Sequence, residues 1–204
     1  MPNCYAIEDL IPVVDPTAYV HPTAVLIGDV IVGPRCYVGP AACLRGDFGR
    51  IVLRDGANVQ DTCVIHGFPD SDTIIETDGH IGHGAVIHGA HIGQNVLVGM
   101  NAVVMDRSEI GESSIIGAMS FVREGTIVPP RSLVLGIPAH VARQVTDQEI
   151  AWKKGGTLEY QNLALRSLAS QRAVEPLSEV QPDRPRFKGG SSITLGTIKA
   201  SLEE

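Results

Sequence analysis

The sequence is poor in aromatic and charged residues, and each shortage excludes something. Aromatic residues make up only 4% of the 204 residues and charged residues 19%, while apolar residues reach 44%. A core rich in small aliphatic side chains and poor in rings favours many thin, similar layers over one bulky centre. The net charge of −7 argues against a nucleic-acid partner, because a phosphate backbone is met by a basic surface.

The sequence leads us to expect neither a membrane-spanning segment nor an export signal. No apolar run approaches the roughly 18 residues of a membrane span, so we expect no membrane partner. The first residues, MPNCYAIEDLIPVV, show no basic start followed by an apolar stretch. None of the four cysteines forms a C-x-x-C pair. A reduced, cytoplasmic setting fits this pattern best.

A six-residue repeat runs along most of the chain. A large aliphatic residue recurs every six positions, with one step of five and two interruptions, RGDFGR at 45–50 and a longer one at roughly 67–80. A small residue usually stands four places later, and Cys36 and Cys63 fit this small register better than a redox role. The seventeen large positions are Val20, Leu26, Val32, Val38, Leu44, Leu53, Val59, Ile65, Ile81, Ile87, Ile92, Val98, Val104, Ile110, Ile116, Val122 and Val128.

Such a repeat is typical of a β-helix, in which short strands turn at Gly, Asp or Asn and stack into triangular coils. Three repeats make a coil of about 18 residues, so that seventeen predict between five and six coils, with strands about 4.8 Å apart. The pattern resembles the left-handed parallel β-helix of hexapeptide-repeat proteins. The resemblance implies the left hand, since the usual crossover rule favours the right hand. We therefore expect an all-β, left-handed β-helix domain at residues 1–140.

Helices are expected after the repeat, which stops near VPPRSLVLGIP at 128–138. Thr146-Asp-Gln-Glu149 offers a capping box for a helix that ends at Gly155–Gly156. A second helical stretch, TLEYQNLALRSLASQ, carries four leucines that could pack on the β-helix or on a neighbour: Leu158, Leu163, Leu165 and Leu168. We assign a C-terminal helical segment to 141–174.

The last part of the chain, 175–204, is dominated by Pro, Ser, Gly and Arg and shows little apolar periodicity. We expect an extended tail there, partly disordered.

Four of the seven histidines lie in HIGHGAVIHGAHIG, which starts at residue 80. His66, His83 and His88 each follow an inward aliphatic position by one or two places, so they should point outward. His83 and His88 fall on successive faces about 120° apart, too divergent for one ion with Zn–N bonds of about 2.0–2.1 Å. Two chains side by side could bring them together, which suggests a metal site between subunits of a trimer.

The spacing alone leaves open whether these three histidines bind a metal or are exposed residues without a role. Three neutral imidazoles and an open fourth position would suit a catalytic metal. The remaining histidines are expected on the surface or in loops: His21, His80, His91 and His140.

Two stretches resemble the γ-class carbonic anhydrase family. They are LRGDFGRIVLRDGANVQDTCVIH at 44–66 and IGHGAVIHG at 81–89. The resemblance implies a homotrimer with zinc, or iron or cobalt, between subunits. His66 and His88 of one chain and His83 of the next would be the ligands.

The same resemblance assigns further residues. Gln60 would position the metal-bound water, Arg45 and Asp61 would form an ion pair that ties subunits together, and Asp47 would stand beside them. A purely structural pairing of Arg45, Asp47 and Asp61 remains an alternative. Later stretches, such as AWKKGGTLEYQNL, are similar to a branch linked to phenylacetate degradation and its cousin from a carnitine operon.

This family chemistry offers two reactions. A metal held by three histidines lowers the pKa of its bound water to about 7. The resulting hydroxide could attack an acyl-CoA thioester or carbon dioxide, the latter giving bicarbonate. Gln60 or the metal would stabilise the oxyanion, and Tyr160 is a further candidate donor, or merely a packing residue. Phe48 stands where founding carbonic anhydrases carry a proton-moving Glu, which argues against fast hydration.

We therefore predict a metal-dependent acyl-CoA thioesterase of phenylacetate catabolism. A γ-type carbonic anhydrase is the first alternative, and a non-catalytic partner that stabilises a CoA-pathway enzyme is the second. A hexapeptide acyltransferase is weaker, because no dedicated acceptor site is visible. Three basic residues are candidates for contact with CoA phosphates, or form a solvated helix face: Lys153, Lys154 and Arg166.

Overall fold

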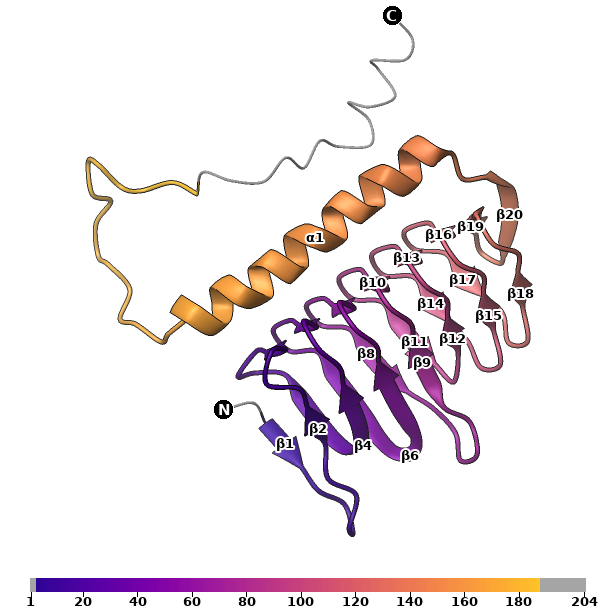
Figure 1. Ribbon diagram of the computed structural model, residues 1–204, viewed down its shortest axis with the longest axis horizontal. Helices are drawn as coiled ribbons and strands as arrows, with labels where there is room; N and C mark the ends of the chain where they lie inside the picture. Colours follow the sequence, from indigo (N-terminus) through magenta and orange to yellow (C-terminus); the bar gives the residue numbers. More distant parts are fainter. Residues whose placement is uncertain (1–2, 188–204) are drawn as a thin grey trace, which may run out of the picture.

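The chain folds into a three-faced parallel β-solenoid with one long helix beside it, as the computed structural model shows for residues 3–187 (Figure 1). Most strands are only two or three residues long. Each pairs in parallel with the strand of the next coil, so Tyr19 lies beside Tyr37 and Leu97 beside Ile115. The predicted β-helix with a helical C-terminal segment is confirmed. Its left-handed sense stays a prediction.

Two faces of the solenoid belong to one twelve-stranded sheet, because β4 and β6 continue from the first face onto the second. The first face holds β1 (Asn3–Tyr5), the start of β4 (Val25–Val32), the start of β6 (Cys43–Leu53), β8 (Val64–His66), β11 (Val86–His88), β14 (Val103–Val104) and β17 (Phe121–Val122). The second holds β2 (Val13–Val14), the ends of β4 and β6, β9 (Thr73–Ile75), β12 (His91–Ile92), β15 (Glu109–Ile110) and β18 (Ile127–Val128).

The third face is a separate sheet of eight strands. It holds β3 (Tyr19–Val20), β5 (Tyr37–Val38), β7 (Asn58–Val59), β10 (His80–Ile81), β13 (Leu97–Val98), β16 (Ile115–Ile116), β19 (Ser132–Gly136) and β20 (Ala139–Gln144). Only β20 is antiparallel, and it folds back on β19 at the end of the solenoid. The other seven strands each belong to one coil, which gives seven coils.

The core is a column of the aliphatic residues that the repeat predicts. All seventeen predicted large positions are buried, and so are the small positions Cys36 and Cys63. Burial raises the pKa of the Cys36 thiol to about 12 and that of the Cys63 thiol to about 11, which fits packing residues rather than reactive ones.

The predicted count of five to six coils was too low, because the repeat extends further than expected. Val134 stacks on Ile116 one step beyond the predicted end. Ile75 lies between Leu53 and Ile92 inside the longer interruption and is fully buried. A loop before Ile75 disguised the six-residue step there. The RGDFGR interruption is a register shift within the paired strands β4 and β6.

The C-terminal segment forms one helix, α1 (Asp147–Ser170), and not the two that the sequence suggested. The predicted capping box of Thr146 and Glu149 is present. The helix continues through Gly155–Gly156 although each glycine costs about 1 kcal/mol of helix stability. Tertiary contacts hold it there: α1 crosses the third face over β3, β5 and β7, and a Cβ on Gly156 would stand 3.9 Å from His80 Cε1.

The side of α1 that faces the solenoid combines polar contacts with a small apolar cluster, in which Leu163 is the one of the four predicted leucines that packs. Leu158, Leu165 and Leu168 are each about half exposed. The buried residues are instead Glu149, Lys153, Thr157, Ala164 and Ser167. The helix is therefore held both by hydrogen bonds and by the packing of Ala164, Tyr160 and Leu163 against Tyr19 and Tyr37 on the solenoid.

Lys153 makes the central polar contact between α1 and the solenoid. Its ammonium group is buried and donates to the carbonyl oxygen of Asp78 and, at 3.0 Å, to Asn95 Oδ1. Burial lowers the pKa of Lys153 to about 7, with Lys154 acting in the same direction. Nearby, Gln161 donates to Asp78 Oδ1 at 2.8 Å. Lys153 is thus a structural clamp, and the solvated helix face expected for it was wrong.

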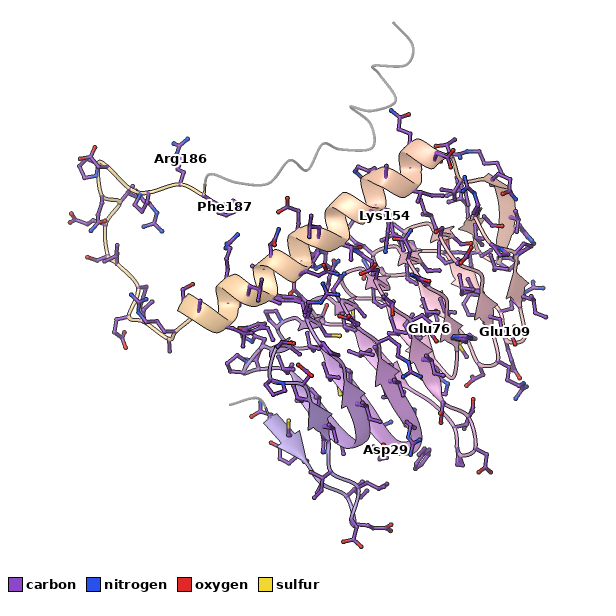
Figure 2. The ribbon with its side chains drawn as sticks, in the orientation of Figure 1. Asp29, Glu76, Glu109, Lys154, Arg186 and Phe187 are labelled. Carbon is purple, nitrogen blue, oxygen red and sulfur yellow. The ribbon has the colours of Figure 1, made fainter. Side chains whose placement is uncertain are left out.

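Beyond α1 the described part of the tail, up to residue 187, contains no helix or strand. Figure 2 shows its last residues, Arg186 and Phe187, on the side of α1 away from the solenoid, where Arg166 lies 4.2 Å above the Phe187 ring. The rest of the predicted tail lies outside the described residues. The helix of the described part, α1, does not have the long apolar stretch that crossing a membrane requires.

Replacing the clamp should weaken the whole fold. Lys153→Met keeps the aliphatic stem but leaves the Asp78 carbonyl and Asn95 Oδ1 without their donor. We expect urea unfolding to show a loss of about 1–3 kcal/mol. Lys154→Met is the matched control on the exposed neighbour and should stay within about 0.5 kcal/mol of the wild type. Equal effects of the two changes would contradict the clamp.

Candidate metal centre

His66 and His88 face each other on neighbouring coils of the first face. They are register partners at the ends of β8 and β11. Each follows a fully buried isoleucine, Ile65 or Ile87, and therefore points outward. His66 Nδ1 and His88 Nε2 are 3.1 Å apart, and the ring centroids 5.1 Å apart. The coil stacking alone brings these two predicted ligands together.

A carboxylate holds the other nitrogen of each ring. Asp47 Oδ1 lies 3.1 Å from His66 Nε2, and Asp106 Oδ1 lies 2.6 Å from His88 Nδ1. A carboxylate only accepts hydrogen bonds, so each ring directs its N–H to its acid. The two nitrogens that face each other therefore both carry lone pairs.

Two facing lone pairs without a proton between them repel, and a cation between them removes the repulsion. Two ligands bonded at about 2.0–2.1 Å to a tetrahedral ion are about 3.3 Å apart, close to the observed 3.1 Å. Histidines oriented by carboxylates are the usual environment of metal-binding imidazoles. The pair therefore fits two ligands of zinc, iron or cobalt.

The surroundings of His66 and Asp47 favour the neutral form of the ring and the ionised form of the acid. Burial is the main cause of a lowered His66 pKa, and the charge of Arg45 adds to it. Burial alone would raise the pKa of Asp47, yet hydrogen bonds and charge from Arg45 hold it below the usual range. Arg45 Nη1 donates to Asp47 Oδ2 at 2.6 Å.

Gly89 makes room for the second acid. It has a φ of +56°, and a Cβ there would lie 2.3 Å from Asp106 Oδ1. Any larger residue would push Asp106 away from His88. The sequence prediction missed Asp106, although it lies 18 residues after His88, one coil further on.

Two phenylalanines flank the pair. The Phe48 ring centroid lies 5.5 Å from that of His66, and Phe68 lies 5.1 Å from His88. Both are more than half exposed. Phe68 belongs to the loop that interrupts the repeat, and nothing in its spacing marked it in advance.

His83, the third predicted ligand, lies elsewhere. It follows β10 on the third face, where its Nδ1 is 2.9 Å from Asp61 Oδ2. Within residues 3–187 of one chain, no three His, Cys, Asp or Glu side chains converge on one point. The predicted ion pair of Arg45 with Asp61 stays a prediction between chains, because within the chain Arg45 pairs with Asp47.

The third face gathers the remaining predicted residues around a hollow of about 400 Å³. Gln60, His83 and Tyr160 line it, together with Met100 and Trp152. Tyr160 reaches it from α1, and its ring lies edge-on to His80 at a centroid distance of 5.3 Å. Burial raises the pKa of Tyr160 to about 12, so that its hydroxyl stays a donor at neutral pH.

His80 supports Gln60 and is not the surface residue expected from the sequence. Gln60 Nε2 donates to Asn58 Oδ1 at 3.1 Å and contacts His80 Nε2 at 2.6 Å. Both amide hydrogens are thus engaged, and the Gln60 carbonyl oxygen is the atom left for a ligand. Burial, followed by Lys153 and His83, lowers the His80 pKa to about 3, so the ring is neutral and can accept.

The architecture is that of a hexapeptide-repeat protein. A family model, bacterial transferase hexapeptide (six repeats), matches residues 89–124. The chain is 55% identical over 189 residues to carnitine operon protein CaiE of Salmonella agona (strain SL483), covering 93% of this chain and 96% of that one. It is 53% identical to CaiE of Escherichia coli (strain K12), covering 93% and 97%. The chain belongs to the CaiE family.

Solved structures agree with this fold. A proposed acetyltransferase of Bacillus cereus, the product of gene BC4754, superposes with a TM-score of 0.82 at 30% identity, covering 83% of this chain and 99% of that one. A hexapeptide transferase family protein from Anaplasma phagocytophilum gives 0.78 at 34% identity, covering 80% and 97%.

Acid should destabilise the fold partly through His80. Its pKa falls from 6.5 to about 3 on folding, so the unfolded chain binds more protons between these values. Stability therefore falls as the pH drops from about 6.5 toward 3. His80→Phe keeps a ring against Tyr160 and should flatten the pH dependence of the unfolding free energy between about pH 4 and 6.5. His140→Phe, at an exposed position, should leave it unchanged. An unaltered slope in His80→Phe would refute this.

Proposed function

We propose that this protein is a metal-dependent thioesterase that hydrolyses acyl-CoA thioesters of phenylacetate catabolism, with its site shared between chains of a homotrimer. The observation that carries the proposal is the His66–His88 pair, two outward imidazoles whose lone pairs meet at 3.1 Å while acids hold their N–H groups. Two imidazoles arranged in this way are suited to bind a metal cation.

The ion would be zinc, or alternatively iron or cobalt. Its ligands would be His66 and His88 of one chain and His83 of a neighbour. When bound, such an ion lowers the pKa of a water molecule and supplies a nucleophile at neutral pH. The His83 ring is already oriented by Asp61 at 2.9 Å, as the other two are by their acids. All three predicted ligands thus share one feature, a carboxylate on the nitrogen that faces away from the ion.

The chain's own residues would orient water and thioester. The Gln60 carbonyl oxygen accepts a hydrogen bond from the attacking water, because the amide hydrogens are engaged by Asn58 and His80. The Tyr160 hydroxyl donates to the oxygen that becomes negative when the thioester carbonyl is attacked. The C–S bond then breaks, the thiol leaves with a proton, and a carboxylic acid remains.

The apolar surroundings favour an acyl group over carbon dioxide. Phe48 and Phe68 flank the histidine pair, and the hollow beside Gln60 is lined by Leu97, Met100 and Trp152. The acids next to the rings, Asp47 and Asp106, are both occupied by hydrogen bonds. Fast hydration of carbon dioxide needs a free proton carrier at this place.

Acyl transfer is the second candidate, and the likeness to a proposed acetyltransferase at 30% identity favours it. Transfer and hydrolysis share the breaking of the thioester and differ in the acceptor, an amine or hydroxyl group in one case and water in the other. Thiol release that depends on an added amine would select transfer, and release in water alone would select hydrolysis.

Removing the third ligand should abolish activity. The wild type should carry about one metal ion per chain and release thiol from aryl acyl-CoA faster than it hydrates carbon dioxide in a stopped-flow assay. His83→Ala should lose the metal and reduce thiol release by about 100-fold or more. His91→Ala, an exposed histidine on the second face, is the control and should keep both. Full turnover by His83→Ala, or a metal-free active enzyme, would rule out the proposal.

The acid behind His88 should matter nearly as much as the ligand itself. Asp106→Asn can no longer fix the His88 tautomer through a charged acceptor, so we expect metal affinity to fall about 10–100-fold with the fold intact. Competition with a chelating dye measures this. Asp29→Asn, in an exposed pair with Arg50, should leave affinity unaltered. An unchanged affinity in Asp106→Asn would show that the ring is held by other contacts.

A further inference from the structure

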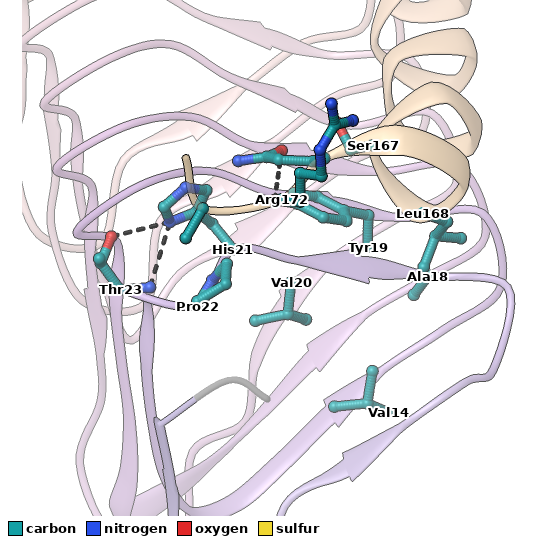
Figure 3. A pocket seen from close by; sticks show the side chains of 12 residues that line it. Val14, Ala18, Tyr19, Val20, His21, Pro22, Thr23, Ser167, Leu168 and Arg172 are labelled. Carbon is teal, nitrogen blue, oxygen red and sulfur yellow. Dashed lines mark hydrogen bonds between the residues drawn. The ribbon is translucent and has the colours of Figure 1, made fainter. Parts of the chain in front are cut away.

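A cavity of about 580 Å³ lies at the first coil of the solenoid, beneath the end of α1 (Figure 3). It is bounded by β2, β3, the turn after β3, the last turn of α1 and the residues that follow it. It shares no lining residue with the His66–His88 pair or with the hollow around Gln60. Its size falls within the range of small-molecule pockets in proteins.

The walls of this first-coil cavity are apolar. Val14 and Val20, from the first layer of the core, form one side, and Ala18 and Leu168 stand around them (Figure 3). Tyr19 closes the cavity toward the helix end, where its hydroxyl is bonded to Gln171 Oε1 at 2.5 Å. An apolar group the size of one ring or a medium alkyl chain fits such walls.

The rim of the cavity offers hydrogen-bond donors. The backbone N–H of Thr23 donates to His21 Nδ1 at 3.1 Å, so the ring proton of neutral His21 is on Nε2. Arg172 lines the cavity and makes no hydrogen bond or ion pair with another residue of the range 3–187. No Asp or Glu lines the cavity, in a chain whose net charge is −7.

The open edge of the third face adds a further donor. β3 is the first strand of its sheet. Tyr19 and His21 direct their N–H groups to the next coil, to Cys36 and Val38. Because alternate residues of a strand point their backbone groups to opposite sides, the N–H of Val20 points away from that coil, toward the open edge.

We propose that this first-coil cavity binds a small carboxylic acid with an apolar aryl or alkyl body. The body lies against Val14, Val20 and Leu168, and the carboxylate meets Arg172 and His21 at the rim. Charge complementarity selects this ligand, because within residues 3–187 Arg172 is the one charged side chain of the lining and no acid lies there to offset it. The inference does not depend on the proposed activity, since no metal ligand takes part.

Methyl NMR of the full-length chain, labelled at alanine and valine, tests the proposal. Hexanoate should shift the methyl signals of Ala18 and Val20 in a saturable manner, and hexanamide, of the same shape without charge, should bind more weakly. A chelator present throughout excludes binding of the acid through a metal. This separates the result from the fate of the thioesterase proposal.

Substitutions at the rim complete the test. Arg172→Gln should weaken hexanoate about tenfold and leave hexanamide unchanged, since only the charge-assisted contact is lost. Arg166→Gln, on α1 but outside the cavity, is the matched control, and Ala173→Trp should fill the mouth and abolish both ligands. Three results would overturn the proposal: no shift at Ala18 and Val20, equal affinity for acid and amide, or binding that Arg172→Gln does not alter.

Discussion

Parallel pairing between successive coils is the constraint on which the rest of this molecule depends. It places each residue beside the one in the matching position of the previous coil, about 18 positions earlier where no loop intervenes. The turn after β14 brings Asp106 beside His88 in this way, at a separation of 18 residues. His66 and His88 are separated by 22 residues and still meet, because the excess is taken up by the loop that carries Phe68. Packing of the core fixes the register of the coils, and the register determines which outward side chains become neighbours.

The repeat predicted the core well and the additions to it poorly. Seventeen large aliphatic core positions and the outward direction of His66, His88 and His83 follow from the six-residue step. Asp106 lies one residue beyond the register position of His88 on the next coil, so the coil period would have marked its neighbourhood but not the residue itself. His80 was not predictable in this way: it occupies an outward position and is half-buried because Tyr160 of α1 packs against its ring. The position of α1 on the third face depends on hydrogen bonds from Lys153 and Gln161, and the spacing of the leucines does not predict these bonds.

The candidate functional residues fall into two sets on different faces of the solenoid. The first face carries the paired imidazoles and their acids. The third carries Gln60, His83 and Tyr160 around an apolar hollow. Within residues 3–187, the first set holds two facing imidazoles and the second an oriented amide with a further imidazole. This division gives the proposed trimer its physical reason, since a neighbour's third face would supply the missing half.

The attachment of α1 to several coils has a consequence for how the solenoid unfolds. Stacked coils contact only their neighbours, so a solenoid can unravel stepwise from either end. Here one rod is fastened to the first coil through Tyr19 and Gln171, and to middle coils through Lys153 with Asn95. Fraying of the first coil therefore has to detach a helix that other coils still hold. The helix thus couples the first and middle coils, so that they are expected to unfold together and not one at a time.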